Sequence, residues 1–136
     1  MPVEQVIATA QKAADAGATE VHIVGGLHPW LKFDYYLDML RGIRAASPSL
    51  HIKAFTAIEI VHFTRIAHMG VREVLAALKE AGLGSLPGGG AEIFDDRVHD
   101  EVFKGKVRAD RWFEVHRIAH SLGLYTNCLL YTSRCV

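Results

Sequence analysis

Ser85-Leu-Pro-Gly-Gly-Gly-Ala-Glu-Ile-Phe94 is the stretch from which the fold of this chain can be read. A short apolar segment leads directly into three glycines and a carboxylate, and a polar region follows. Glycines let a backbone approach a ligand closely and point bare N–H groups at an anion. At the C-terminal end of a parallel strand, such a turn typically faces a small-molecule site. The alternative is a loop that needs its glycines only for positive φ angles, which glycines alone would favour.

The segments around this stretch repeat one unit, a helix that ends at a glycine and passes within a few residues into a strand. Helices are expected over residues 3–16, 34–46, 58–68, 71–81 and 111–122, and strands that begin near residues 20, 50, 83 and 124. Asp34 is the expected cap of the second helix, and the polar segment 95–108 has room for a short helix. The repeated unit predicts an α/β fold with parallel strands and right-handed crossovers. A piece of a (β/α) barrel and a small doubly wound sheet both fit. Because a complete barrel takes roughly 250 residues, four units would be about half of one.

Size and composition predict one small domain and exclude several classes of function. The chain has 136 residues, half of them apolar, and a formal net charge of zero. This balance gives no electrostatic footprint for nucleic acid or for an acidic membrane surface, so a small molecule is the expected partner. No apolar run approaches the length of a membrane span. With only two cysteines, a reducing cytoplasm is the expected location.

Candidate site residues follow the expected strand ends, where ligand sites of parallel α/β folds collect. They are Gly25, Gly26 and His28 after the first strand, Thr56 and Glu59 after the second, and Ser85, Gly88, Gly89, Gly90 and Glu92 in and after the third. The carboxylates of Glu59 and Glu92 could hold a ribose hydroxyl or an ammonium group. The alternative for both is an ordinary carboxylate in the first turn of a helix.

The histidines predict no metal site. His116 and His120 have a spacing that can chelate zinc, but the glutamate of the H-E-x-x-H pattern is missing. Both are expected at the edge of an apolar stripe, as surface histidines, and the same interpretation applies to His62, His68 and His99. The sequence also contains no G-x-S-x-G motif, and no catalytic nucleophile is predicted.

Three motifs, taken together, resemble one family. They are His22-Ile-Val-Gly-Gly-Leu-His-Pro29, Lys53-Ala-Phe-Thr-Ala-Ile-Glu-Ile60 and Leu86-Pro-Gly-Gly-Gly-Ala-Glu-Ile-Phe94, and they look like those of aminofutalosine synthase. Members of this family are radical S-adenosylmethionine enzymes of the futalosine route to menaquinone. Dehypoxanthine futalosine cyclase and FO synthase share the glycine-rich segment and remain alternatives, although Thr56-Ala57, where the cyclase tends to carry Ser-Pro, favours the synthase. A non-catalytic, small-molecule-binding α/β module is the alternative from another class.

The resemblance implies a barrel of radical S-adenosylmethionine type and a transferase reaction. In the family, a [4Fe–4S] cluster donates an electron to S-adenosylmethionine and cleaves it to methionine and a 5′-deoxyadenosyl radical. This radical adds to the double bond of 3-[(1-carboxyvinyl)oxy]benzoate, and rearrangement with loss of the carboxyl group gives aminofutalosine. The matching positions imply that the cofactor is contacted by Gly25, Gly26, Ser85, Gly88, Gly89, Gly90 and Glu92. The substrate would be faced by His28, Thr56 and Glu59.

The sequence departs from the family in two places. It contains no Cys-xxx-Cys-xx-Cys loop, and Cys128 and Cys135 cannot replace it. We therefore expect the cluster in a longer parent enzyme, no metal site in this chain, and no activity of the chain alone. The resemblance covers residues 1–127, whereas 128–136 do not match and are expected to be foreign sequence. The expected fold is thus a central slice of about four βα units with two open strand edges, which favours aggregation.

Overall fold

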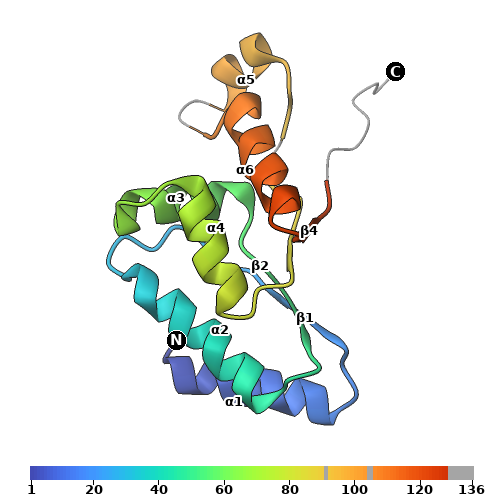
Figure 1. The fold of residues 1–136 in the computed structure, drawn as a ribbon. Helices are drawn as coiled ribbons and strands as arrows, with labels where there is room; N and C mark the ends of the chain where they lie inside the picture. Colours follow the sequence, from blue (N-terminus) through green and yellow to red (C-terminus); the bar gives the residue numbers. More distant parts are fainter. Residues whose placement is uncertain (91, 104–105, 129–136) are drawn as a thin grey trace.

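A computed structural model describes residues 1–90, 92–103 and 106–128. Helices and strands alternate along the chain (Figure 1). In order they are α1 (Val3–Asp15), β1 (Glu20–Ile23), α2 (Phe33–Ala46), β2 (His51–Ala54), α3 (Ala57–Ala67), α4 (Val71–Glu80), β3 (Ser85–Leu86), α5 (Asp96–Val102), α6 (Ala109–Ser121) and β4 (Tyr125–Thr126). The expected helices and strands are confirmed to within a few residues, and the polar segment 95–108 does contain a helix, α5.

The described strands form one parallel sheet in the order β1-β2-β3-β4, which confirms a partial (β/α) barrel. The helices cover one face of this sheet, as β2 illustrates. Ile52 and Ala54 are fully buried beneath the helices, whereas His51 and Lys53 are half-buried on the opposite face. The face that would line the interior of a complete barrel is therefore open in this chain.

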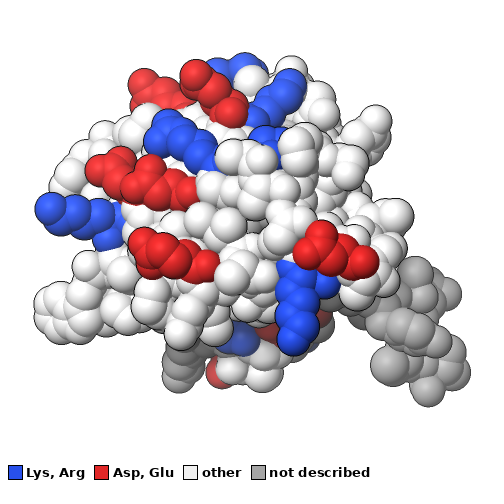
Figure 2. Space-filling model, turned by 90° about the horizontal axis from the view of Figure 1, so that it is seen from below, with Lys and Arg blue, Asp and Glu red and all other residues white. Residues whose placement is uncertain are grey.

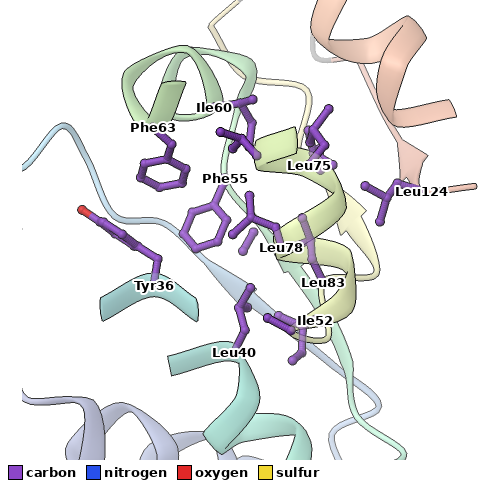
Figure 3. Close-up of a cluster of buried hydrophobic side chains, with 14 of the residues drawn as sticks. Tyr36, Leu40, Ile52, Phe55, Ile60, Phe63, Leu75, Leu78, Leu83 and Leu124 are labelled. Carbon is purple, nitrogen blue, oxygen red and sulfur yellow. The ribbon is translucent and has the colours of Figure 1, made fainter. Parts of the chain in front are cut away.

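Figure 3 shows the apolar core between the sheet and the helices, with an aromatic cluster on one side of it. The ring centroids of Tyr36 and Phe63 lie 4.4 Å apart, and those of Phe55 and Phe63 lie 5.0 Å apart. Such pairs contribute about 0.5–1.5 kcal/mol each beyond the burial of their area. This cluster joins α2, α3 and the end of β2, so it fixes the loops at the carboxyl ends of the first two strands.

Local features position the first helices. α1 and α2 pack closely at Gly42, where an added Cβ would lie 2.2 Å from Cδ1 of Ile7. The prediction that Asp34 caps α2 is wrong: Lys32 occupies the N-cap position and Asp34 lies in the first turn. A carboxylate in the first turn still interacts favourably with the helix dipole, so Asp34 does mark the start of α2, although it is not the capping residue.

The described surface carries charges of both signs. On the face shown in Figure 2, acidic and basic side chains are interspersed, and neither sign gathers into a continuous patch. Within the described ranges, no helix has both the length and the apolar character needed to cross a membrane.

Candidate functional site at the carboxyl ends of the strands

Glu59 joins the ends of the first two strands. Its backbone lies in the first turn of α3, and its carboxylate accepts hydrogen bonds from Thr56 N–H (2.9 Å) and Thr56 Oγ1 (3.0 Å). It also accepts one from the Gly26 N–H, 3.1 Å away and on the other side of the junction. The residue is only 5% exposed. Glu59 therefore serves both as the capping carboxylate of α3 and as a link to the loop after β1.

The glycine pair after β1 fits around this carboxylate. A Cβ at Gly25 would lie 3.1 Å from Glu59 Oε1, which is tighter than ordinary van der Waals contact. Gly26 has φ +119°, and a Cβ there would meet nothing within 4 Å. The first glycine thus provides space for Glu59, and the second provides a backbone conformation next to open space.

The triple glycine packs on the same junction from the other side. A Cβ on Gly89 would lie 3.2 Å from the Thr56 methyl group, and one on Gly90, whose φ is +84°, would lie 2.6 Å from Ile58 Cδ1. A Cβ on Gly88 would lie 2.1 Å from the Asn127 carbonyl oxygen. Packing within the chain is therefore sufficient to explain Gly88 and Gly90, whereas a side chain at Gly89 would meet only the Thr56 methyl group. The cofactor contacts that the resemblance implies for them remain a prediction.

Two residues other than glycine adopt positive φ at these strand ends. Phe55, directly before Thr56, has φ 65°, and Glu92, in the loop after β3, has φ 54°. Such conformations persist where the surroundings over-determine them, and they cluster at functional sites. The Glu92 carboxylate lies 3.2 Å from Lys106 Nζ. Among the described residues, no hydrogen bond or ion pair joins Glu92 to Glu59, so the structure does not bring these two predicted carboxylates together.

His28 lies on an exposed loop beside a wide cavity. Its Nδ1 accepts a hydrogen bond from the Trp30 N–H at 3.2 Å, and its carbonyl oxygen lies 3.3 Å from His62 Nε2. The cavity, of about 620 Å³, extends along the edge strand β1 and is lined by Gly25, Gly26 and His28 among mainly apolar side chains. Its volume suits a small molecule, although a further strand paired with β1 would occupy part of it.

Tyr36 is a buried member of the same cavity wall. Burial, and then the charge of Glu59, raises the pKa of its hydroxyl. Tyr36 therefore stays neutral and can act only as a hydrogen-bonding phenol at ordinary pH.

Ser85 lies apart from the junction, on the open face of the sheet. Its hydroxyl is hydrogen-bonded to His51 Nε2 at 2.8 Å, and it lines a second cavity of about 210 Å³ together with Glu20 and Lys53. Sequence reasoning missed Glu20, His51 and Lys53. The available signal was the alternation of polar and apolar residues along β1 and β2, which places the polar ones on one face.

The interpretation of His99 as a surface residue is wrong because its side chain is buried, and the interpretation of His116 as a surface residue is wrong too. It is buried, its ring stacks on Trp112 with centroids 3.7 Å apart, and burial, then the charge of His120, lowers its pKa to about 4. His120 is exposed, and its Nε2 lies 2.7 Å from Thr126 Oγ1. Within the part of the chain that the structure describes, no group of three or more His, Cys, Asp or Glu residues could hold a metal ion.

Comparisons with known proteins place this geometry in context. A family model described as Radical SAM superfamily matches residues 1–133. The chain is 48% identical over 128 residues to the aminodeoxyfutalosine synthase of Thermus thermophilus, covering 94% of this chain and 34% of that protein. It is 42% identical over 130 residues to a 5-amino-6-(D-ribitylamino)uracil–L-tyrosine 4-hydroxyphenyl transferase of Methanopyrus kandleri, covering 96% and 35%.

An FO synthase of Streptomyces avermitilis is 42% identical over 124 residues, covering 91% of this chain and 14% of that protein. The chain therefore spans about a third of the length of the first two relatives and less of the third. The family match includes residues up to 133, whereas residues 129–136 lie outside the described part of the structure. The expected boundary at residue 127 stays a prediction.

Proposed function

This chain belongs to the radical SAM superfamily, and on that premise we propose that it is a segment of an aminodeoxyfutalosine synthase. The observation that carries the proposal is the 48% identity over 94% of the chain, combined with the junction at which Glu59 joins two strand ends. The proposed parent reaction is the one implied by the sequence resemblance, in which 3-[(1-carboxyvinyl)oxy]benzoate and S-adenosylmethionine give aminofutalosine.

The strand-end loops of this chain would form one wall of the S-adenosylmethionine site. The cofactor supplies the 5′-deoxyadenosyl group as a radical. Gly25 and Gly26 line the cavity along β1, and Gly26 borders open space, which fits close approach of a ligand to this backbone. We propose that Glu59 positions the Gly25-Gly26 backbone, because its carboxylate accepts a hydrogen bond from the Gly26 N–H.

The residues of this chain do not fit a [4Fe–4S] cluster. Such a cluster is held by cysteine thiolates, and the sequence has only two cysteines, of which Cys135 lies outside the described residues. Cluster binding is therefore assigned to another part of the parent, and the chain alone is proposed to be inactive. A cytoplasmic location and a small-molecule substrate, without nucleic acid or membrane partners, complete the proposal.

The test is the product of the full-length parent, reconstituted with iron and sulfide under anaerobic conditions. It is incubated with S-adenosylmethionine and either 3-[(1-carboxyvinyl)oxy]benzoate or tyrosine plus 5-amino-6-(D-ribitylamino)uracil, and the products are identified by mass spectrometry. We expect aminofutalosine to form from S-adenosylmethionine and 3-[(1-carboxyvinyl)oxy]benzoate, and no product to form from tyrosine. Turnover of tyrosine instead would replace the proposal with the transferase activity named for the Methanopyrus relative.

A further inference from the structure

The open face of the sheet carries a connected set of charged and polar side chains from three strands. Glu20 Oε1 lies 3.0 Å from Lys53 Nζ, and Glu20 Oε2 lies 3.8 Å from His51 Nε2. His51 Nε2 is in turn hydrogen-bonded to the Ser85 hydroxyl at 2.8 Å. These four side chains, called the inner-face cluster below, line the cavity of about 210 Å³.

The composition of this face is unusual for the interior of a barrel. Barrel interiors are mostly filled by layers of branched apolar side chains, and charged groups are costly to bury unless they are paired. Here the registered positions on β1, β2 and β3 instead carry Glu20, His51, Lys53 and Ser85. A face of this kind is suited to contact with a polar ligand rather than to a packed apolar core.

We propose that the inner-face cluster is a binding subsite for the carboxylate of a small ligand, with Lys53 as the binding cation. The Lys53 ammonium, the His51 ring and the Ser85 hydroxyl can all donate to one anion. When no such anion is bound, the Glu20 carboxylate forms an ion pair with the Lys53 ammonium. The identity of the ligand as the parent's substrate rests on the proposed function, but the subsite itself does not.

Glu20 is the resident counter-ion in this arrangement. The hydrogen bond from Lys53 is the largest influence on its carboxyl and, with the charges of Lys53, His51 and His22, lowers its pKa. An arriving carboxylate must compete with Glu20 for Lys53. The four groups could instead form only a structural link between strands. The two explanations predict opposite effects of removing Glu20.

The test is a titration of the ¹⁵N-labelled full-length parent with benzoate, followed by amide NMR shifts, because the chain alone is expected to aggregate. Acetate, benzamide and inorganic phosphate are titrated in parallel as probes of charge and shape. The variants are Glu20→Gln, Lys53→Met, Lys53→Arg and the double variant Glu20→Gln/Lys53→Met. The double variant removes both members of the ion pair, so it replaces Lys53→Met if the unpaired Glu20 of that variant prevents folding. Lys12→Met on the exposed face of α1 is the matched control.

We expect benzoate to shift the amides around Lys53 and Ser85, with benzamide inactive. Lys53→Met and the double variant should weaken binding at least about fivefold, Lys53→Arg should retain it, and Glu20→Gln should tighten it about two- to fivefold, the range that removal of an exposed ion-pair partner allows. Unchanged or weaker binding in Glu20→Gln, or benzoate shifts that survive in the double variant, would overturn the subsite. Tighter binding of phosphate than of benzoate would overturn the assignment to carboxylates.

The outcomes separate this inference from the proposed function. If benzoate does not bind at Lys53 but the parent forms aminofutalosine, only the subsite is wrong. If benzoate binds there but the parent turns over tyrosine, the subsite stands and the proposed function is wrong.

Discussion

Replacing Glu59 by alanine tests whether this side chain joins two strand ends or merely caps its own helix. The substitution removes the acceptor of two Thr56 hydrogen bonds and of the Gly26 N–H bond. A capping residue contributes about 1 kcal/mol, and a hydrogen bond to a charged group contributes about 1.5–3 kcal/mol. Because the site is buried and its donors would be left unsatisfied, we expect Glu59→Ala to lower the free energy of unfolding by about 3 kcal/mol.

Glu73 provides a matched control. It occupies the same position in the first turn of α4, where its carboxylate accepts the Gly70 N–H at 2.8 Å. This bond is local and exposed, so Glu73→Ala should cost about 1 kcal/mol or less. The difference of about 2 kcal/mol between the two variants is the contribution assigned to the link across the strand ends.

Urea unfolding followed by circular dichroism measures both variants, and amide hydrogen exchange reports on the link itself. We expect the Gly26 amide to exchange faster in Glu59→Ala and to be unchanged in Glu73→Ala. If the two variants lose the same stability to within about 0.5 kcal/mol, and Gly26 keeps its protection, Glu59 is a helix cap and nothing more.

Three further predictions follow from packing and burial. Gly88→Ala should destabilise the chain by about 2–3 kcal/mol because its Cβ would collide with the Asn127 backbone. In Gly89→Ala the Cβ meets only a methyl group at 3.2 Å, so this control variant should lose less than about 1 kcal/mol. Equal losses of unfolding free energy in urea would contradict the close approach at Gly88. Phe63→Ala should cost about 3–5 kcal/mol, and Phe113→Ala, at a site 38% exposed, should cost far less, so similar melting temperatures for the two variants would argue against the aromatic cluster as the core. The pKa of His116 is lowered from 6.5 to about 4, so between these pH values the unfolded chain binds a proton that the folded chain does not, and the free energy of unfolding should fall as the pH falls. His116→Phe should therefore lose less stability than the natural chain between pH 6.5 and pH 4. Parallel pH profiles of the two proteins would contradict the burial of the ring.

Much of the fold could be predicted because its signals are local. Helical periodicity and terminal glycines such as Gly17 and Gly82 define the helices and mark where strands begin. The strand-end position of Thr56 and Glu59 follows from the same pattern. Even the short helix α5 (Asp96–Val102) was a possibility that the polar sequence left open.

The errors and omissions concern properties that depend on tertiary contacts. Whether His116 is buried depends on the packing of α6 (Ala109–Ser121), and the helical pattern alone placed it only at the edge of the apolar stripe. The inner-face cluster requires the register between strands, which pairs Glu20 with His51 and Lys53 with Ser85. No pattern within one strand specifies that register.

The glycine-rich loop illustrates a second limit of the sequence. The sequence predicts that the glycines either allow close approach of a ligand or supply positive φ angles, yet only Gly90 of the three has a positive φ. Gly88 is instead placed where the Asn127 backbone leaves no room for a side chain, and a Cβ at Gly89 would press only lightly on the Thr56 methyl group. Such a steric reason arises from residues distant in the chain, including Thr56 and Asn127, and could not be inferred locally.

The central claim is that this chain is one part of a radical SAM barrel whose parent supplies the cluster ligands elsewhere. A single long sequencing read across the source locus, through both ends of this reading frame, tests it most directly. We expect an in-frame Cys-xxx-Cys-xx-Cys motif upstream of residue 1 and a continuing barrel sequence downstream. A complete reading frame that encodes this chain without such a motif would contradict the account.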